Sequence, residues 1–546
     1  MTTTSSNWWK STTVYHIYIR SFLDTNGDGI GDLDGVIAKL DYIQSMGFES
    51  IWISPFTESP QKDFGYDISD YQAISPLFGT MQTVEKLLQE VHARGMKLIL
   101  DMVLNHTSAE HAWFKESASS RDNPKADWYV WKDGKGKDGL QRPNNWRAMA
   151  GNRAWIYHPV RKQFYYSGFL PFQPDLNYRN PEVKAAIFNM VRFWLDKGVD
   201  GFRLDIISAI YEDPMLQDNP FSYKIAPSDN SLTIFFQHLK NNFLQEDSFG
   251  FATELRKVLE EYPNKFMVGE THGDESLIHQ FCKYKQENGL HTVFLFKAIT
   301  TSFNATAYRK MVEKFEKYFP EPLIPTYVFG NHDRTRMFAR LKGNIAKAKL
   351  LALFQFTARG IPFVYYGEEI GIPRVRIPLR QAQDPIGVRM RYIPQFMVDL
   401  SIETLNRDEC RTPMQWDNSH NAGFCAKEIK PWLPVSENYT YCNVLTEQNE
   451  EHSLLNFYKK IIHYRNNTPA IKSGKLEIAE EYCSKKVLAF YRVLEEKYFI
   501  ILLNMSDKKV TLPEIKGINC LSTYSAITEK NSLNPWEGRI VEMEKK

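Results

Sequence analysis

Four short apolar segments of the chain end in carboxylate or histidine side chains, which can act as acids, bases and nucleophiles. The four ends read DMVLNH (101–106), GFRLD (201–205), VGE (268–270) and GNHD (330–333). A single carboxylate at a strand end is more often a helix cap, because aspartate is favoured there. Four such ends in one chain instead indicate one shared site, since the strand ends of a closed parallel barrel meet at one mouth.

Asp205 and Glu270 have the surroundings that glycoside cleavage needs. Side chains alternate along a strand, so Arg203 shares a face with Asp205 and can hold that carboxylate ionised. Glu270 follows the apolar run Phe-Met-Val, where loss of solvent raises the pKa of a carboxyl group. An ionised nucleophile and a protonated acid about 5 to 5.5 Å apart cleave a glycosidic bond through a covalent intermediate, with retention of configuration. We therefore predict that Asp205 is the nucleophile and Glu270 the general acid/base.

The same strand ends supply groups that can hold a sugar. His106 and His332 are expected to donate hydrogen bonds to sugar hydroxyls, and Asp333 to clamp hydroxyls in a way that favours a distorted ring.

The elements that position these residues follow a repeating pattern. Short β-branched or aromatic runs alternate with amphipathic stretches such as residues 83–95 and 183–197, which indicates βαβ units. Eight runs are predicted as strands, at residues 13–22, 50–56, 96–104, 201–207, 265–270, 291–296, 325–330 and 361–366. Eight parallel strands are the number that a closed (β/α)₈ TIM barrel of the α/β class requires.

Two long connections and one change of pattern divide the chain further. Residues 105–178 are too long for an ordinary loop and predict a subdomain inserted after the third strand. Residues 371–447 form a second excursion, after the eighth strand. Alternating strands near the end predict a C-terminal antiparallel β-sandwich. The predicted organisation is therefore barrel (1–104), inserted subdomain (105–178), barrel (179–476) and C-terminal domain (477–546).

Composition excludes several classes of function. The 546 residues carry a net charge of +2 without basic runs, which argues against nucleic-acid binding. The N-terminus lacks a signal-peptide pattern and no stretch approaches 18 apolar residues, so we predict a cytoplasmic location and no membrane partner. Six cysteines without a C-x-x-C pair predict isolated thiols. The expected partner is a small neutral oligosaccharide, and the oligomeric state is left open.

In order and spacing, DMVLNH, GFRLD, VGE, FGNHD (329–333) and QPDLN (173–177) resemble the conserved segments of the α-amylase family, over almost the whole chain. NHTSAEHAWF (105–114) and RTPMQW (411–416) resemble the branch that holds α-glucosidases and oligo-1,6-glucosidases. The resemblance implies that Asp205 is the nucleophile, Glu270 the acid/base and Asp333 a third carboxylate that stabilises the transition state.

The resemblance also implies a substrate pocket. In DFGYD, Asp63 and Tyr66 match binders of the non-reducing glucose, with Tyr66 as a stacking platform and Asp63 acting alongside Arg411. Such a set closes the far side of the site and implies exo cleavage. The alternative for each residue is barrel packing or a surface ion pair. The predicted substrate-binding residues are Asp63, Tyr66, His106, Phe169, Gln173, Arg203, His332, Arg407 and Arg411.

A loop after the first predicted strand places oxygen atoms at every second position. Its predicted ligands are the side chains of Asp24, Asn26, Asp28 and Asp32 and the backbone of Ile30. Such a set suits a hard cation, and the resemblance implies a structural Ca²⁺. The alternative is an Asp- and Gly-rich turn that needs no ion.

The predicted function is an exo-acting retaining α-glucosidase that releases terminal glucose from short α-1,6- or α-1,4-linked oligosaccharides. A transglycosylase, or a sucrose or trehalose isomerase, is the alternative that uses the same intermediate, and a non-catalytic partner with this fold is a remote one. Ile206 follows the nucleophile, where related enzymes carry Val for α-1,6 cleavage and Ala or Thr for α-1,4. Ile is closer to Val in shape, which favours α-1,6 substrates.

Overall fold

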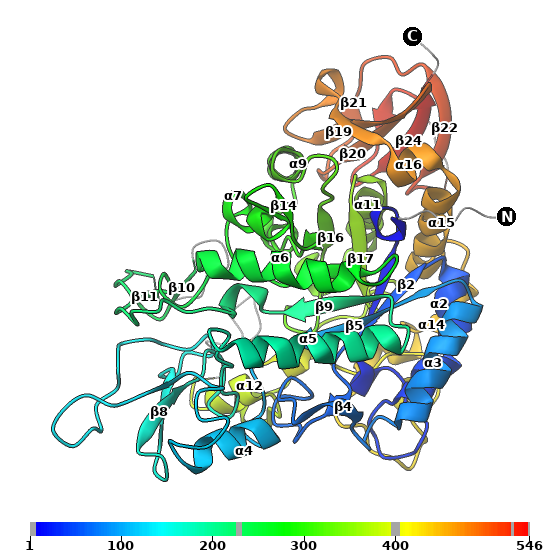
Figure 1. Cartoon of the computed structure of the whole chain (residues 1–546). Helices are drawn as coiled ribbons and strands as arrows, with labels where there is room; N and C mark the ends of the chain where they lie inside the picture. Colours follow the sequence, from blue (N-terminus) through cyan, green and yellow to red (C-terminus); the bar gives the residue numbers. More distant parts are fainter. Residues whose placement is uncertain (1–6, 225–231, 395–404, 526–528, 544–546) are drawn as a thin grey trace. The chain divides into compact units, whose positions relative to one another are not determined.

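A computed structural model of the chain describes residues 7–224, 232–394, 405–525 and 529–543 (Figure 1). The chain divides into two compact units. We call the first the terminal unit, which comprises Met1–Ile51, Gln89–Met96 and Leu295–Lys546. The second, the central unit, comprises Trp52–Leu88 and Lys97–Phe294.

Eight strands of the main sheet lie where the sequence predicts them. They are β1 (Val14–Ile17), β2 (Ser50–Ile53), β5 (Lys97–Val103), β9 (Gly201–Asp205), β12 (Phe266–Gly269), β15 (Thr292–Val293), β16 (Thr326–Val328) and β17 (Ile361–Tyr365). In the central unit the neighbours run β5-β9-β12-β15, and in the terminal unit β1-β17-β16, with parallel pairing. β2 contributes residues to both units. Both faces of these strands are buried, as expected where helices cover a parallel sheet. The predicted (β/α)₈ fold is confirmed.

Helices follow the strands, and α5 (Pro181–Asp196) begins with residues that typically start a helix. The described helices are α1 (Leu33–Ala38), α2 (Leu40–Met46), α3 (Met81–Ala93), α4 (Ala112–Ser119), α5 (Pro181–Asp196), α6 (Glu246–Glu260), α7 (Glu275–Ile278), α8 (Lys297–Thr300), α9 (Ala305–Tyr318), α10 (Met337–Arg340), α11 (Ile345–Thr357), α12 (Pro385–Arg389), α14 (Val444–Gln448), α15 (Leu454–Asn467) and α16 (Pro469–Ser473). Asn180 caps α5 by accepting a hydrogen bond from the backbone N–H of Glu182 at 2.8 Å, and Pro181 occupies the first turn. In the central unit α5 and α6 lie side by side over β9 (Figure 1).

The predicted insertion forms a small layer of its own in the central unit. Strands β6 (Trp131–Lys132), β8 (Gln163–Tyr166) and β7 (Trp155–His158) pair antiparallel in the order β6-β8-β7. Trp146, Trp155 and Phe164 pack in its core. Short hairpins elsewhere in this unit are β3 (Thr57–Glu58) with β4 (Asp70–Ile74), β10 (Thr233–Ile234) with β11 (Gln237–His238), and β13 (Lys283–Tyr284) with β14 (Glu287–Asn288).

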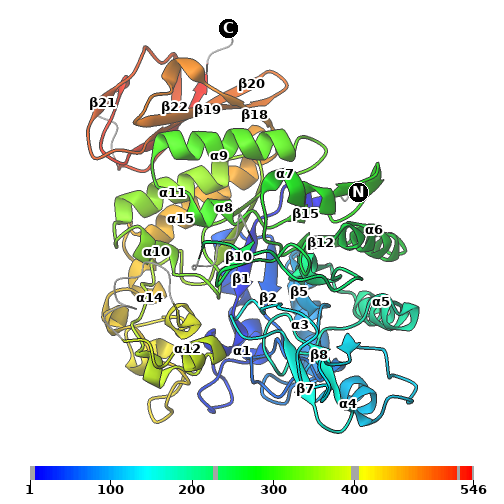
Figure 2. The same cartoon turned by 90° about the vertical axis from the view of Figure 1, so that its left-hand side faces the viewer.

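The chain ends in the antiparallel sheet that the sequence predicts. Its order is β18 (Lys475–Ile478), β19 (Val487–Leu494), β20 (Lys497–Asn504), β24 (Gly538–Met543) and β22 (Gly517–Ser522), beside the pair β21 (Val510–Thr511) and β23 (Ser532–Leu533). Within the terminal unit, α9 and α11 pack against this sheet (Figure 2). The six cysteines are free thiols, as expected. In the described part of the chain, no helix has both the length and the apolar character of a membrane span.

Candidate active site

One buried arginine gathers three carboxyl groups in the central unit. Arg203 Nη1 is 2.7 Å from Asp101 Oδ1 and 2.7 Å from Asp205 Oδ1, and Nη2 donates to Glu270 Oε2. Strand register explains the cluster, because Asp101 of β5 and Val268 of β12 both pair with Arg203 of β9. Arg203 was predicted to bind substrate, but it is only 1 % exposed and its hydrogen bonds go to carboxyl groups.

Burial and charge oppose each other in this cluster. Asp205 and Glu270 are 9 % and 8 % exposed, and a hydrogen bond joins their carboxyl groups. Burial raises the pKa of Asp205 to about 6, although the charge of Arg203 lowers it. Burial likewise raises the pKa of Asp101 to about 6. One cation therefore faces three carboxyl groups, and near pH 6 the cluster can hold an ionised carboxylate and a protonated acid together.

Asp101 links this cluster to a second group of predicted residues. Its Oδ2 accepts hydrogen bonds from Tyr66 Oη at 3.0 Å and Trp52 Nε1 at 3.2 Å. Asp101 lies in the DMVLNH motif but is not among the predicted site residues. The available signal was an acid inside an otherwise apolar strand, which needs a charged partner when buried.

Asp63, Tyr66, His106 and Gln173 come together in the central unit. Gln173 Nε2 donates to Asp63 Oδ2 at 3.0 Å and to the backbone oxygen of Tyr66 at 3.3 Å. His106 Nε2 lies 3.1 Å from that same oxygen and must donate, because a carbonyl only accepts. Burial lowers the pKa of His106 to about 4, so its ring is neutral at physiological pH. Phe169, also predicted, is half-buried in the loop that leads to Gln173.

A strained turn presents Asp63 and Tyr66. Phe64 adopts φ +53° and Gly65 φ +106°, a region that most side chains avoid. Asp67 holds the turn, because its carboxylate accepts hydrogen bonds from the backbone N–H of Asp63 at 2.9 Å and of Lys62 at 3.0 Å. Residues in sparsely populated conformations persist where their surroundings fix them, which is common at binding sites.

The terminal unit holds the other predicted site residues in one charged group. Asp333 Oδ1 lies 2.7 Å from Arg411 Nη2 and 3.1 Å from Arg407 Nη1. Asp333 Oδ2 lies 3.1 Å from His332 Nε2. The ring of His332 stacks on Tyr18, with centroids 5.6 Å apart and an interplanar angle of 15°. Tyr18 is not among the predicted site residues, because an aromatic residue in an apolar run indicates a core position.

Ile206 follows the nucleophile in an unusual conformation. Its φ of +37° lies in the left-handed region, where β-branched residues are outliers. Its half-buried side chain packs against a cluster that contains Ile234, Leu239 and Phe243. Ile206, which is predicted to influence linkage preference, therefore packs against the region of the β10–β11 hairpin.

The predicted metal loop is closed by its own backbone. Asp24 accepts hydrogen bonds from the N–H groups of Gly27 at 2.7 Å and Gly29 at 2.9 Å, and Asp28 Oδ1 accepts from Ile30 at 2.8 Å. Asp32 caps α1. Among the described residues, no group of three or more His, Cys, Asp and Glu side chains is placed to hold a metal. Each of these carboxylate oxygens still has a second lone pair, and the amide of Asn26 and the backbone of Ile30 supply further oxygens.

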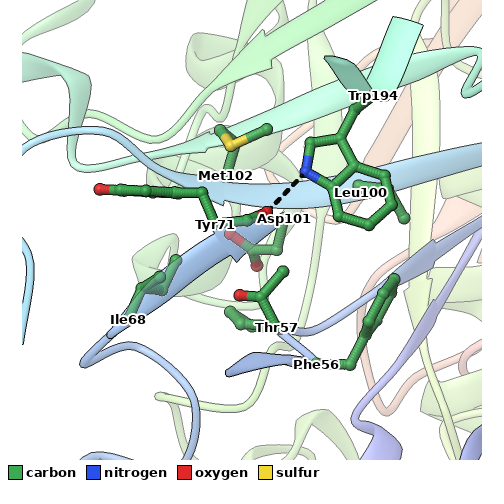
Figure 3. A pocket seen from close by; sticks show the side chains of 9 residues that line it. Phe56, Thr57, Ile68, Tyr71, Leu100, Asp101, Met102 and Trp194 are labelled. Atoms are coloured by element: carbon green, nitrogen blue, oxygen red, sulfur yellow. Dashed lines mark hydrogen bonds between the residues drawn. The ribbon is translucent and has the colours of Figure 1, made fainter. Parts of the chain in front are cut away.

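A small cavity lies on the outer side of β5 (Figure 3). Leu100 and Met102 line it together with Trp194, whose Nε1 donates to the backbone oxygen of Tyr71 at 3.0 Å. Asp101 also contributes to the lining, but because strand side chains alternate, Leu100 and Met102 point away from its carboxylate. This mostly apolar cavity is therefore packing space behind the strand.

Comparison with known proteins identifies the family of the chain. Residues 16–474 match the alpha-amylase catalytic domain family. The chain is 37 % identical to a probable alpha-glucosidase of Rhizobium meliloti, covering 96 % of this chain and 94 % of that protein. It is 36 % identical to an oligo-1,6-glucosidase of Parageobacillus thermoglucosidasius, over 98 % of both. The crystal structure of an alpha-glucosyl transfer enzyme is 36 % identical over 99 % and 100 % of the two chains, with a TM-score of 0.89. The chain belongs to the alpha-amylase family.

Proposed function

We propose that the protein is an exo-acting retaining α-glucosidase that removes terminal glucose from short oligosaccharides. The observation that carries the proposal is the hydrogen-bonded cluster of Asp205, Glu270 and Arg203, connected through Asp101 to Tyr66. The α-glucosidase and oligo-1,6-glucosidase relatives support the same activity. The cytoplasmic location and the absence of nucleic-acid partners stay predictions from the sequence.

Two displacements at the anomeric carbon follow from this arrangement. Asp205 attacks that carbon while Glu270 gives its proton to the departing glycosidic oxygen. Water then attacks the same carbon and loses a proton to Glu270, and the carboxylate of Asp205 leaves. Arg203 keeps Asp205 ionised, and Asp333, by its motif, is proposed to stabilise the charged sugar in the transition state.

Glucose should be released one unit at a time. Asp63, Gln173 and Tyr66 form a connected polar set that can close around a terminal sugar, which leaves no passage for a continuing chain. Maltose and isomaltose are expected to release their non-reducing glucose in its α form, whereas starch viscosity should hardly change. Chromatography and NMR of the first products measure this. Rapid loss of viscosity with little free glucose would contradict exo action, and β-glucose as the first product of an aryl α-glucoside would contradict retention.

Transfer to another sugar is the alternative, because the glucosyl-enzyme reacts with any hydroxyl that reaches it. The similarity to an alpha-glucosyl transfer enzyme favours this candidate. Product analysis on sucrose and maltose distinguishes the two functions, since transfer gives new disaccharides and hydrolysis gives monosaccharides.

Ile206 is proposed to favour α-1,6 linkages by narrowing the space beside the leaving sugar. The Ile206→Ala variant is expected to lower the ratio of kcat/KM on isomaltose to that on maltose by about 10-fold, within the range of ~1–3 kcal/mol that such contacts contribute. Leu239→Ala, which removes a buried side chain from the same cluster, is the control for packing effects. An unchanged ratio in Ile206→Ala, or an equal change in the control, would exclude direct linkage control.

We further propose that residues 24–32 hold a structural Ca²⁺. Asp24 and Asp28 are turned into the loop by their backbone hydrogen bonds, and the oxygens there are the hard ligands that calcium prefers. The ion would stiffen the loop and take no part in catalysis.

Removing calcium is therefore expected to lower thermal stability but not initial activity. A ligand that binds only the folded state stabilises it by mass action, so a chelator should reduce Tm by several degrees. Differential scanning calorimetry and initial rates, each with and without EDTA, measure the two effects. Immediate loss of activity at constant Tm would argue that the ion, if bound, lies at the catalytic centre.

A further inference from the structure

A fully buried aspartate holds one of the arginines that contact Asp333. Asp384 is 0 % exposed and precedes α12, where its Oδ2 accepts a hydrogen bond from the backbone N–H of Gly387 at 3.2 Å. Its Oδ1 lies 2.8 Å from Arg407 Nε and 2.6 Å from Arg407 Nη2. The remaining terminal nitrogen of that guanidinium, Nη1, lies 3.1 Å from Asp333 Oδ1. Arg407 therefore bridges the buried carboxylate of Asp384 and the carboxylate of Asp333, whose side chain is 27 % exposed.

Asp384 is itself fixed by the chain around it. Its Oδ2 also accepts from the backbone N–H of Arg407 at 3.2 Å, and its own N–H donates to Asp408 Oδ2 at 3.1 Å. Burial would raise the pKa of Asp384, but the charges of Arg407 and Arg411 outweigh it and hold this pKa below its usual range. The carboxylate is therefore an ionised and rigid support for Arg407.

The charge balance around Asp333 depends on this support. Arg407 and Arg411 together carry two positive charges, and the negative charge of Asp384 neutralises much of the charge of Arg407. A guanidinium that loses one carboxylate partner turns its paired N–H groups toward the next, because bidentate pairing is the stronger geometry. Without Asp384, Arg407 would pair with Asp333 through two nitrogens and pull its carboxylate out of position.

We propose that Asp384 is a positioning residue for the glucosidase reaction, acting through Arg407 on the orientation of Asp333. The inference rests on the proposed function, because it takes Asp333 to contact the sugar. It deepens that function by assigning a role to a residue that touches no substrate and to the excursion after β17 that carries it.

The test is the Asp384→Asn variant, in which asparagine keeps the size and the helix cap but loses the charge. We expect kcat per active site on maltose or isomaltose, whichever the wild type cleaves faster, to fall about 10- to 100-fold, the scale of a displacement near 1 Å, with KM changed less than about threefold. Active sites are counted by trapping with a fluoroglucoside. Glu409→Gln is the matched control, since Glu409 is also a buried partner of an arginine, Arg374, at 2.6 Å. The control should retain wild-type kcat per active site.

A double-mutant cycle separates positioning from folding. In an Arg407→Gln background, Asp384→Asn should cost no further kcat. The inference would be overturned if Asp384→Asn kept wild-type kcat or lost no more kcat than Glu409→Gln. It would also be overturned if Asp384→Asn lost as much kcat in the Arg407→Gln background as it does alone. Asp333→Asn is measured alongside: if it stays active, the proposed role of Asp333 fails, and the inference that depends on it fails with it.

Discussion

Replacing Asp205 with asparagine is expected to lower kcat on an aryl α-glucoside by at least about 10³-fold. Asparagine keeps the shape of the side chain but has no negative charge with which to form the glucosyl ester. Glu270→Gln should cost a similar factor on maltose and isomaltose, whose leaving groups need a proton. Steady-state kinetics on both substrate types measure these losses.

Azide and a matched variant make this result specific. Azide should restore turnover in Asp205→Gly with a β-glucosyl azide product, and in Glu270→Gly with an α-glucosyl azide product, because only the second variant forms the covalent intermediate. Glu212→Gln is the control, because Glu212 is also a buried carboxyl group of the central unit, and burial raises its pKa well above its usual range. Near-normal turnover in Asp205→Asn would contradict the assignment.

Replacing Arg203 with methionine is expected to destabilise the fold by about 3–5 kcal/mol, because three buried carboxyl groups lose their cation. The same change should also move the acidic limb of the pH–rate profile. The pKa of Asp205 is about 6, so wild-type kcat/KM should fall as the pH drops below about 6 and the nucleophile becomes protonated. Without Arg203 this pKa rises further, and the limb moves to higher pH. Urea unfolding and pH–rate profiles measure the two effects.

Arg179→Met is the control for removing a positive charge from the central unit. Arg179 pairs with Asp247 at 3.0 Å, but both side chains are more than a third exposed, and such pairs contribute little. Its free energy of unfolding and acidic limb should match the wild type. An Arg203→Met protein with wild-type stability and an unmoved limb would show that the carboxyl cluster does not depend on its cation.

The sequence predicts the parts of the fold that depend on local pattern. All eight main strands were located because their apolar runs are continuous and end in polar residues, although the hydrogen-bonded strands are shorter. β1, predicted over 13–22, ends at Ile17 because the chain turns into a short helix at Ile19–Ser21. Helix α3 begins at Met81, before the start of the predicted amphipathic stretch at residue 83, because Thr80 provides the oxygen for its first turn.

The site residues that escaped prediction are those whose role depends on distant partners. Asp101 lies within the apolar strand β5, Tyr18 lies in the apolar run of residues 13–22, and Asp384 lies in a loop without a recognisable motif. Their importance comes from Arg203, His332 and Arg407, which are near them only in space. The left-handed backbone of Ile206 could not be predicted either, because a β-branched residue favours an extended backbone with negative φ.

The pairing of β1 with β17 constrains when this protein can fold during its synthesis. Val14 pairs in register with Phe363, so the first strand leaves the ribosome long before its partner on this edge, β17, exists. At typical translation rates the delay is roughly 20 to 70 s. During that time β1, with four consecutive buried residues, exposes an apolar edge that invites pairing with another nascent chain. The central unit, Trp52–Leu88 and Lys97–Phe294, is fully translated earlier, so chaperone dependence during expression should concentrate on the terminal unit.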